Sequence, residues 1–275
     1  YYHSPCCDAQ FFSLCGQHNM CLLIFSHRVD PNYPLVLAAN RDEFHARPTA
    51  AARFWPEHPR LLAGRDLEQG GTWMGLTREG RFAAITNCRD PARTAPAPRS
   101  RGELPLGYLT GSQDAQTYLM DTLANAQEYA GFNLLVGTPD SLWYLTNSPS
   151  AEQCEPTLLA PGLYGLSNAQ LDTPWPKVIA GKHKLRSLLE GTGEPDHESL
   201  ARVVAGRDLA DPKELELQGL DGDMDQLLSA QFIVSSLYGT RSTTTLWRNA
   251  QGRTHWQELT YDQQGALQGT QREAF

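Results

Sequence analysis

Two apolar segments joined by a turn-rich connection constrain the fold of this chain more than any other stretch. Segments Met20–Phe25 and Leu35–Ala39 have the composition of buried strands, and Val29–Pro34 between them is rich in turn formers. Cys21 stands near the start of the first strand, and the polar cluster Asn40–Glu43 follows the second. We therefore predict a hairpin whose two ends share one pocket. We expect the second strand to curl back or overshoot in order to bring these ends together.

Similar hairpin signals recur along the chain and favour antiparallel sheets. The turns Arg78–Gly80 and Thr138–Asp140 separate strand-like segments and are too short for crossover helices. We predict strands at 21–27, 35–39, 82–87, 132–137, 141–146, 162–167, 232–235, 242–247 and 254–260, a loop entering a strand at 70–76, and irregular structure at 48–59. Helices are predicted at 114–126, from 173 to 189 and at 198–204, and Ser100 is predicted to cap another. This order predicts an α+β fold of two packed antiparallel sheets with helices on the outer faces.

Composition limits the number of domains and the class of partner. No linker rich in Ser, Gly or Pro divides the 275 residues, so we predict one domain over residues 20–275. The net charge of -8 argues against a nucleic-acid partner, because phosphate binding draws on clustered Lys and Arg. We interpret the basic stretch Arg89–Arg101 as a surface loop, with contact to an anionic ligand as the alternative. No run of 18 apolar residues exists, so no membrane span is expected.

The first 19 residues differ in character from the rest of the chain. They lack the basic start of a signal peptide and contain three of the six cysteines. We interpret Tyr1–Asn19 as a cloning artefact, an upstream read-through or a propeptide, favour the first two, and take Met20 as the natural start. The remaining cysteines, Cys21, Cys88 and Cys154, are too widely spaced for a disulfide framework or a zinc site. We expect a reducing, cytoplasmic location, no metal and no cofactor.

Cys21 is the first candidate for chemistry. If Met20 is removed, the thiol of Cys21 sits beside its own free α-amino group, whose ordinary pKa is about 7.7–8.0. That amine can accept the thiol proton directly or through one water, so one residue would supply both nucleophile and base. The alternative is a buried structural cysteine at the head of a core strand.

The other candidates are polar residues that follow strands. In the cluster Asn40–Glu43, a guanidinium could favour a thiolate and a carboxylate could orient the amine; the alternative is a solvated strand end with a surface ion pair. Asn87 and Asn168 each follow a strand and could donate to an oxyanion, or could only form turns. Arg241 heads a Thr-rich segment and is either functional or an ordinary surface arginine.

Six short motifs together resemble the NRDE family, which is the family of the transport and Golgi organisation protein 2. The resemblance covers the chain from Met20 to the C-terminus. The motifs are Met20-Cys21, Asn40-Arg41-Asp42-Glu43, Gly70-Gly71-Thr72-Trp73, Thr86-Asn87, Tyr164-Gly165-Leu166-Ser167-Asn168 and Tyr238-Gly239-Thr240-Arg241-Ser242. The family is similar to N-terminal nucleophile hydrolases of the choloylglycine hydrolase and penicillin V acylase group, which implies a four-layer αββα sandwich.

The resemblance also implies roles for individual residues. By motif, Cys21 takes the place of the nucleophile, Arg41 that of the first arginine, and Asp42 that of the aspartate, with Glu43 as the alternative. Asn87 and Asn168 match the asparagines at the oxyanion, and Arg241 matches the late arginine. Residues ahead of Cys21 would acylate its α-amine, so the printed chain is expected to be inactive unless it is trimmed.

Two classes of function follow from the resemblance. The first is an amidohydrolase that cleaves a linear C–N bond of an N-acyl amide. The second is a carrier that binds haem, acyl-CoA or a lipid in the same pocket without chemistry, because relatives are linked to haem trafficking and to lipid handling. A scaffold with a vestigial pocket is a third option. In each of the first two cases the partner is a small molecule.

Overall fold

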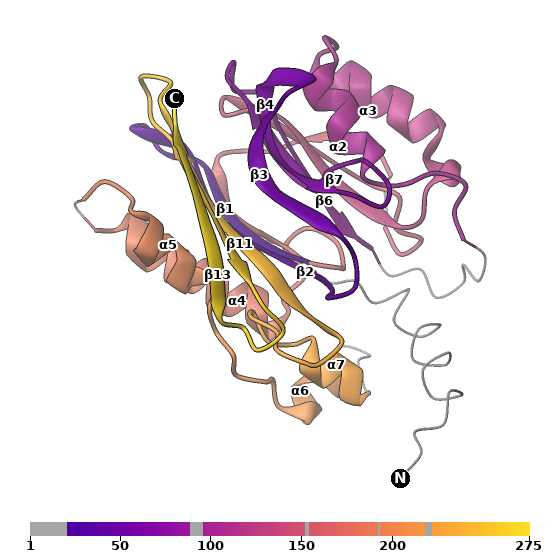
Figure 1. Cartoon of the computed structure of the whole chain (residues 1–275), viewed down its shortest axis with the longest axis vertical. Coiled ribbons are helices and arrows are strands. Elements are labelled where there is room, and N and C mark those ends of the chain that lie inside the picture. Colours follow the sequence, from indigo (N-terminus) through magenta and orange to yellow (C-terminus); the bar gives the residue numbers. More distant parts are fainter. Residues whose placement is uncertain (1–20, 89–95, 152–153, 192, 218–221) are drawn as a thin grey trace.

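The computed structural model describes residues 21–88, 96–151, 154–191, 193–217 and 222–275 (Figure 1). Met20 and the proposed extension Tyr1–Asn19 lie outside the described residues, as do residues 89–95 of the basic stretch. Within the described ranges, no helix combines the length and the apolar character needed to cross a membrane.

One antiparallel sheet contains the N-terminal hairpin. In the described part of the chain it has six strands in the order β10-β1-β2-β11-β12-β13. Their bounds are β1 Cys21–Asp30, β2 Tyr33–Phe44, β10 Gly162–Leu166, β11 Tyr238–Arg248, β12 Thr254–Tyr261 and β13 Leu267–Ala274. Strand β2 is buried over residues 35–43 because it lies in the interior of this sheet, between β1 and β11.

The hairpin of β1 and β2 is a regular antiparallel pair. Cys21 lies opposite Arg41, and Leu23 lies opposite Ala39. The expectation that the second strand must curl back or overshoot is wrong, because the start of one hairpin strand and the end of the other are neighbours in any antiparallel pair. Side chains that lie directly opposite project from the same face, so the hairpin alone brings Cys21 beside Arg41.

The second sheet is a meander. Among the described residues it has seven antiparallel strands, which follow one another in chain order. Their bounds are β3 Thr49–Trp55, β4 His58–Asp66, β5 Met74–Thr77, β6 Phe82–Asn87, β7 Phe132–Thr138, β8 Ser141–Thr146 and β9 Thr157–Leu158. Short turns connect most of these strands, as the hairpin signals predict.

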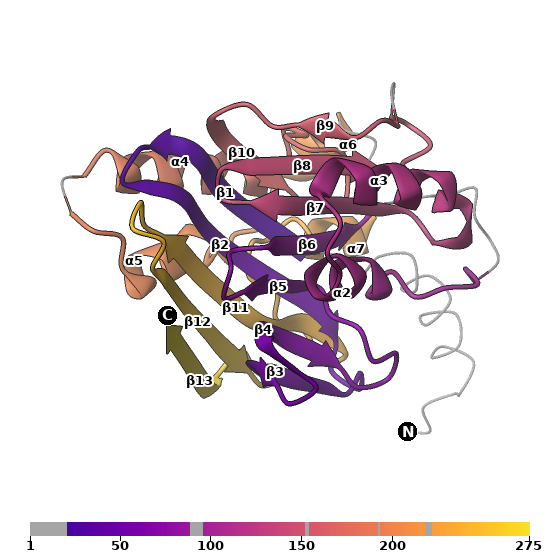
Figure 2. The same ribbon diagram turned by 90° about the horizontal axis from the view of Figure 1, so that it is seen from above.

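Helices cover the outer face of each sheet (Figures 1 and 2). The helices α2 Glu103–Thr110 and α3 Ala115–Ala124, with the 3-10 turn η1 Ala126–Glu128, lie on the meander side. The helices α4 Pro176–Leu189, α5 His197–Val203, α6 Pro212–Glu216 and α7 Asp223–Leu227 lie on the other side. The fold is therefore an α+β, four-layer αββα sandwich, which confirms the predicted class.

Strand alternation divides the apolar side chains among three cores. On β1, Leu23 and Phe25 enter the core between the two sheets, together with Phe82 of β6. Leu22 and Ile24 point the other way and pack under α4 and α5. A third core lies between the meander and α2–α3. Successive side chains of a strand alternate between faces, so only every second residue of β2 lies on the same face as Cys21.

Several local predictions differ from the structure. The segment predicted as irregular contains β3, and Ser100 does not cap α2, whose N-cap is Gly102 without a side-chain bond. Residues 232–235 form only an isolated bridge, between Val234 and Gly239. The strands β9 and β13 and the short helices α6 and α7 carry too little apolar periodicity to be predicted.

Candidate functional site

A small pocket lies between the sheets at the start of β1. It has a volume of about 250 Å³ including its open mouth. Its lining comes from both sheets: Cys21, Leu23, Ala39, Asn40, Arg41, Trp73, Met74, Ile85 and Thr244. The thiol and a guanidinium therefore face a mainly apolar space, as the hairpin predicts.

The main chain of Cys21 is held by the end of β10. The nitrogen of Cys21 donates a hydrogen bond to Oδ1 of Asn168 at 3.1 Å, and the Ser167 hydroxyl donates to the Cys21 carbonyl at 2.8 Å. The same hydroxyl lies 3.3 Å from Oδ1 of Asn168. Both polar groups of the Cys21 backbone thus have partners in the motif Tyr164–Asn168, so the nitrogen next to the thiol occupies a defined position.

The thiol itself is protonated at neutral pH. Burial, followed by the negative charge of Asp42, raises the pKa of Cys21 to about 12. Arg41 and a hydrogen bond from the Asp42 backbone lower it, but by less than burial raises it. The guanidinium therefore acts in the expected direction without producing a thiolate. Any attack by this sulfur needs a base that removes the proton during the reaction.

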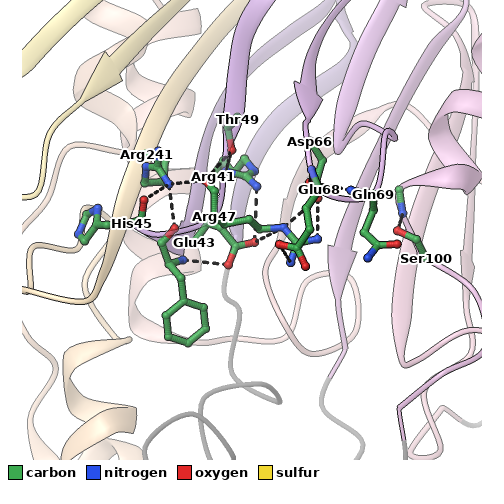
Figure 3. Close-up of polar contacts among 12 residues, drawn as sticks. Arg41, Glu43, His45, Arg47, Thr49, Asp66, Glu68, Gln69, Ser100 and Arg241 are labelled. Atoms are coloured by element: carbon green, nitrogen blue, oxygen red, sulfur yellow. Dashed lines mark hydrogen bonds and ion pairs between the residues drawn. The ribbon is translucent and has the colours of Figure 1, made fainter. Parts of the chain in front are cut away.

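Arg41 links the two sheets at the pocket. Its guanidinium carbon lies 4.4 Å from the ring centroid of Trp73, which belongs to the motif Gly70–Trp73. One nitrogen pairs with Glu43 at 3.5 Å, and another bonds to the Thr49 hydroxyl at 3.3 Å (Figure 3). The side chain is only 6% exposed, so its charge is held in a fixed position by an aromatic face and a carboxylate.

The four residues Asn40–Glu43 divide between the two faces of β2. Arg41 and Glu43 share the face of Cys21, because alternate residues of a strand point the same way. Asn40 points to the helix side, where it donates to the carbonyls of Val204 and Gln231 at 2.8 and 2.7 Å. Asn40 therefore has a structural position, beneath the sheet.

Asp42 also points to the helix side. Its Oδ1 accepts a hydrogen bond from the Thr240 hydroxyl at 2.6 Å, while Oδ2 is buried without a hydrogen-bond partner among the described residues. Burial raises the pKa of this carboxyl to about 7, and the charge of Lys177 acts in the opposite direction. Asp42 thus affects the thiol through its charge and its backbone, whereas Glu43 is the carboxylate on the thiol's own face.

Glu43 is the centre of a chain of ion pairs. Besides Arg41 it contacts Arg47 at 3.7 Å, and Arg47 in turn binds Asp66 at 2.7 Å (Figure 3). Glu43 also accepts a bond from the backbone of Phe44 at 2.9 Å. These pairs connect the end of β2 to the end of β4 beside the pocket.

Arg241 lies near this network and holds backbone. Its Nη1 lies 2.8 Å from the Phe44 carbonyl, 3.3 Å from that of His45 and 3.2 Å from that of Arg47 (Figure 3). Arg241 stands where β11 has a register shift opposite β2, between Thr240 and Ser242. The late arginine therefore fixes the turn after the Asn40–Glu43 cluster and is not among the residues that line the pocket.

The two asparagines have different surroundings. Asn168 is buried and bonded to Cys21, as described above. Asn87 ends β6 and is partly exposed. Alternation places it on the face of Ala83 and Ile85, which pack toward α2 and α3. The structure thus brings Cys21, Arg41, Glu43 and Asn168 together, whereas Asn87 is not among the residues that line the pocket.

A polar network that was not recognised from the sequence supports Asn168, although Thr86 and Ser167 belong to the six motifs. The Thr86 hydroxyl donates to the Ser167 carbonyl at 2.6 Å, and Nδ2 of Asn133 donates to Thr86 at 3.1 Å and to the Ala169 carbonyl at 2.8 Å. The Tyr144 hydroxyl donates to Oδ1 of Asn133 at 2.7 Å. For Asn133 and Tyr144, the only signal in the sequence is that Asn133 is a polar residue within an apolar strand.

A buried carboxyl, Glu258, was also missed. It projects from β12 opposite Thr244, which lines the pocket. One oxygen accepts from the backbone of Ala52 at 2.7 Å, and the other has no hydrogen-bond partner among the described residues. Burial raises the pKa of Glu258 to about 7. A single carboxyl in a strand rich in polar residues gives no sign in the sequence that it is buried.

Comparison with known proteins decides the family. Residues 20–263 match the model of the family described as Transport and Golgi organisation 2. The chain belongs to this family. The transport and Golgi organization protein 2 homolog of Bos taurus is 37% identical over 261 residues, which cover 87% of this chain and 92% of that protein. The Homo sapiens homolog is 34% identical over 280 residues, covering 88% and 98%.

A structural comparison adds a weaker likeness for this member of the transport and Golgi organisation 2 family. The Caenorhabditis elegans ortholog of N-acylethanolamine-hydrolyzing acid amidase matches with a TM-score of 0.39 and 9% identity, covering 82% of this chain and 92% of that one. A likeness of this size carries no argument about activity. The resemblance to the family rests on the sequence matches, and the fold rests on the sheet order.

Proposed function

We propose that this member of the transport and Golgi organisation 2 family is an amidohydrolase in which Cys21 attacks the carbonyl carbon of an N-acyl amide, so that the C–N bond is cleaved. The observation that supports the proposal most is the position of the Cys21 nitrogen. It is bonded to Asn168 while the side chain of the same residue faces Arg41 in a pocket. A free amine at that position would be the base that the protonated thiol requires.

The reaction would proceed in two stages. The sulfur bonds to the carbonyl carbon while the α-amine takes the thiol proton. The C–N bond then breaks, the amine passes that proton to the leaving nitrogen, and a thioester remains on Cys21. Water, deprotonated by the same amine, attacks the thioester and releases the carboxylic acid and the thiol.

The neighbours of Cys21 would have separate roles. Asn168 holds the amine through Oδ1, and its Nδ2 group is the donor that we assign to the oxyanion, with Asn87 as the alternative donor. The unpartnered Oδ2 of Asp42 is the acceptor that we assign to a second proton of the free amine. Arg41 would stabilise negative charge that develops on the sulfur or on the substrate. Arg241 would act at a distance, by holding the turn after the cluster.

The proposal requires a chain that begins at Cys21. We therefore assign residues ahead of Cys21 to a segment that is absent from the active protein. The location that we propose is the reducing cytoplasm, since Cys21, Cys88 and Cys154 all carry free thiols in the structure.

The test compares two forms of the protein, the printed chain and the same chain cut so that it starts at Cys21. Each is incubated with a panel of N-acyl amides and with an electrophilic β-lactone, and adducts are located by mass spectrometry. We expect turnover and a Cys21 adduct in the trimmed form alone. Cys21→Ser should abolish both signals, and Cys154→Ser, at a half-buried thiol outside the pocket, should preserve them. A trimmed protein with neither adduct nor turnover would refute the proposal.

The second candidate function is a carrier. The observation that favours it is the raised pKa of the Cys21 thiol, because a protonated sulfur is a poor nucleophile. The enclosed part of the pocket is far smaller than the pockets that enclose drug-sized molecules, which counts against a large ligand in the conformation described. Titration with haem and with acyl-CoA, repeated on Cys21→Ala and Arg41→Ala, tests this function. Tight binding that both substitutions weaken would support the carrier, and binding that ignores both would place the ligand elsewhere.

A further inference from the structure

The segment that carries Asn168 is a closed loop, which we call the Asn168 loop (residues 165–172). Its two ends bond to each other twice, because the nitrogen of Asp172 donates to the Gly165 carbonyl and the nitrogen of Gly165 donates to Oδ1 of Asp172, both at 2.8 Å. Asp172 has a φ of 61°, in the left-handed region that residues other than glycine rarely adopt. Lys182 of α4 holds the same carboxylate at 2.6 Å. The ends of the loop are therefore fixed by β10 and α4.

The middle of the Asn168 loop is bonded to the opposite sheet. Three alternate residues of the loop each use a backbone atom to meet a side chain from a different strand of the meander. The pairs are the Ser167 carbonyl with Thr86 of β6 at 2.6 Å, the Ala169 carbonyl with Asn133 of β7 at 2.8 Å, and the Leu171 nitrogen with Tyr144 of β8 at 3.2 Å. Because β6, β7 and β8 are neighbours, the loop runs across them and is held at three points.

Asn133 is the centre of these contacts. Its Oδ1 accepts from the Tyr144 hydroxyl at 2.7 Å, and its Nδ2 donates to the Thr86 hydroxyl as well as to the Ala169 carbonyl. The Tyr144 hydroxyl accepts from Leu171 and donates to Asn133, so its two bonds have complementary directions. Asn133 is fully buried and both ends of its amide are bonded, so the side chain cannot turn without leaving a buried polar group unpaired. The network therefore specifies a single position for the loop.

The Asn168 loop transmits this position to Cys21 through two adjacent residues. Ser167 is held by its carbonyl, and its hydroxyl donates to the Cys21 carbonyl at 2.8 Å. Asn168, the next residue, accepts from the Cys21 nitrogen through Oδ1 at 3.1 Å. A shift of the loop would therefore move both partners of the Cys21 backbone together. Misplacement of a reacting group by about 1 Å can slow an enzymatic reaction by about 100-fold.

We propose that Asn133 and Tyr144 are positioning residues that place Oδ1 of Asn168 against the nitrogen of Cys21. This inference rests on the proposed function, because it concerns the amine that serves as the base in that reaction. Neither side chain is among those that line the pocket, so both act through the Asn168 loop. Side chains of the meander thereby control chemistry at the first strand of the other sheet.

The surroundings of Asn133 argue for a role beyond stability. Asn133 lies on the face of β7 that also presents Leu135 to the apolar core between the sheets. Packing alone would be met there by an apolar residue, which needs no hydrogen-bond partner. A fully bonded polar network in such a core instead fixes one arrangement of the groups around it. In this protein that arrangement ends at the reacting cysteine.

The first test compares two tyrosines in protein that starts at Cys21. Tyr144→Phe removes the bond to Asn133, and Tyr118→Phe removes an equivalent bond on α3, from the hydroxyl to the Leu104 carbonyl at 2.7 Å. The rate of β-lactone adduct formation at Cys21 is measured by mass spectrometry, and melting temperatures show whether each variant is folded. We expect Tyr144→Phe to slow the reaction about tenfold, the equivalent of one neutral hydrogen bond. Tyr118→Phe should stay within about twofold of the wild type.

A double substitution separates positioning from a general loss of stability. If Tyr144 acts through Asn168, Tyr144→Phe should change the rate by less than about twofold in the Asn168→Ala background. An undiminished effect in that background would overturn the inference, as would an unchanged rate in Tyr144→Phe or equal slowing by Tyr118→Phe. Asn133→Ala should slow the reaction more than Tyr144→Phe does, because it also releases the Ala169 carbonyl.

The second test needs no turnover. Protein that starts at Cys21 is prepared with isotope-labelled cysteine, and the pKa of the α-amine is measured from the Cys21 signals in nuclear magnetic resonance spectra as pH changes. We expect Tyr144→Phe to lower this pKa, because an acceptor that stabilises the charged amine is displaced, and Tyr118→Phe to leave it unchanged. All these proteins share the charged groups around Cys21, namely Arg41, Asp42 and Glu43.

The two tests separate failure of the inference from failure of the proposed function. If the wild-type protein forms no adduct, the hydrolase proposal fails and the titration alone decides. A pKa of the amine that is lowered in Tyr144→Phe and not in Tyr118→Phe would then still support the positioning role. Equal values in all three proteins would overturn that role, whether or not the wild type reacts.

Discussion

At the scale of single residues, the function depends on how the Cys21 nitrogen is held. Asn168 supplies the acceptor, and Ser167 fixes the carbonyl of the same residue. The thiol keeps its proton at neutral pH, because its pKa is raised to about 12. Precise placement of the amine would therefore decide whether the thiol proton can leave.

The first prediction concerns Asn168. In protein that starts at Cys21, Asn168→Ala should lower the rate of Cys21 acylation by about 100- to 1,000-fold, because both the acceptor for the amine and an oxyanion donor are lost. The measurement is the rate of β-lactone adduct formation by mass spectrometry. Asn249→Ala, at a turn far from the pocket, is the control. An unchanged rate in a folded Asn168→Ala variant would remove Asn168 from the mechanism.

The second prediction concerns Glu258, whose pKa is raised to about 7 by burial. Between its ordinary value near 4.5 and 7, the folded protein retains a proton that the unfolded chain has lost. The free energy of unfolding should therefore fall as pH rises through this window, by at most about 3 kcal/mol from this residue. Asp42 contributes a slope of the same sign.

Glu258→Gln removes one titrating group, so its pH profile should be flatter than that of the wild type between pH 4.5 and 7. Urea unfolding at several pH values measures the difference. Glu216→Gln, at an exposed position of α6, should follow the wild-type profile. Parallel profiles for Glu258→Gln and the wild type would show that the carboxyl titrates normally.

Much of the site could be predicted at this scale, and what was missed has a physical reason. The closeness of Cys21 and Arg41 was predicted from the hairpin, but with an unneeded curl of the second strand, because antiparallel pairing alone joins those ends. The resemblance supplied Asn168. The sequence left open whether Asp42 or Glu43 is the acidic residue beside Cys21. Only the observed strand β2 shows that the two side chains lie on opposite faces. Glu258 was not identified, because burial of a lone charged residue depends on the layers above it.

At the scale of elements, close packing of β10 under α4 fixes the position of Ser167 and Asn168. A Cβ atom at Gly165 would lie 2.5 Å from Cγ1 of Val178 and 3.3 Å from Cδ1 of Ile24. Val178 and Ile24 are both buried, so neither has room to move away. A glycine in the middle of this strand is therefore a packing requirement.

The third prediction follows from this contact. Gly165→Ala should lower the free energy of unfolding by about 1–2 kcal/mol, because overpacking costs about 1–3 kcal/mol and exceeds the backbone gain of alanine. Chemical denaturation measures the change. Gly193→Ala, where an added Cβ meets nothing within 4 Å, should alter stability by less than about 0.5 kcal/mol. Equal stabilities of the two variants would show that α4 and β10 are less tightly packed than described.

The elements with clear apolar alternation were predicted well. The strand β6 occupies the predicted residues 82–87, and β8 occupies 141–146. In contrast, β13 is mostly exposed and polar, and β3 lies in a stretch bounded by Pro48 and Pro59. Local apolar patterns detect a strand that buries one face. An exposed edge strand such as β13 lacks that pattern, because it forms through its hydrogen bonds to the neighbouring strand β12.

At the scale of the molecule, the residues of the site join the two sheets. Arg41 of β2 stacks on Trp73, which precedes β5, and Thr86 of β6 bonds to Ser167 after β10. One core lies between the sheets along much of their length. We therefore propose that residues 20–275 form a single domain, as the lack of a linker predicts.

The fourth prediction tests that domain. Unfolding followed by circular dichroism and by tryptophan fluorescence should give one coincident transition, because loss of either sheet exposes the shared core. Two transitions, or midpoints that differ between the probes, would show that the sheets are separate units. The predicted fold class was correct at this scale, but the order of strands was not accessible, since periodicity does not reveal which distant strand pairs with β2.

The order of strands also has a consequence for synthesis. The meander uses β3 to β9 in succession, so all its pairings exist once the ribosome has released residues up to Leu158. The edge of β2 that includes Asn40–Glu43 cannot form its hydrogen bonds until β11, which begins at Tyr238, has been synthesised. A nascent or prematurely terminated chain would leave that hydrogen-bonding edge open to other polypeptides. Chaperone contact with the growing chain should therefore centre on its first hairpin until translation is nearly finished.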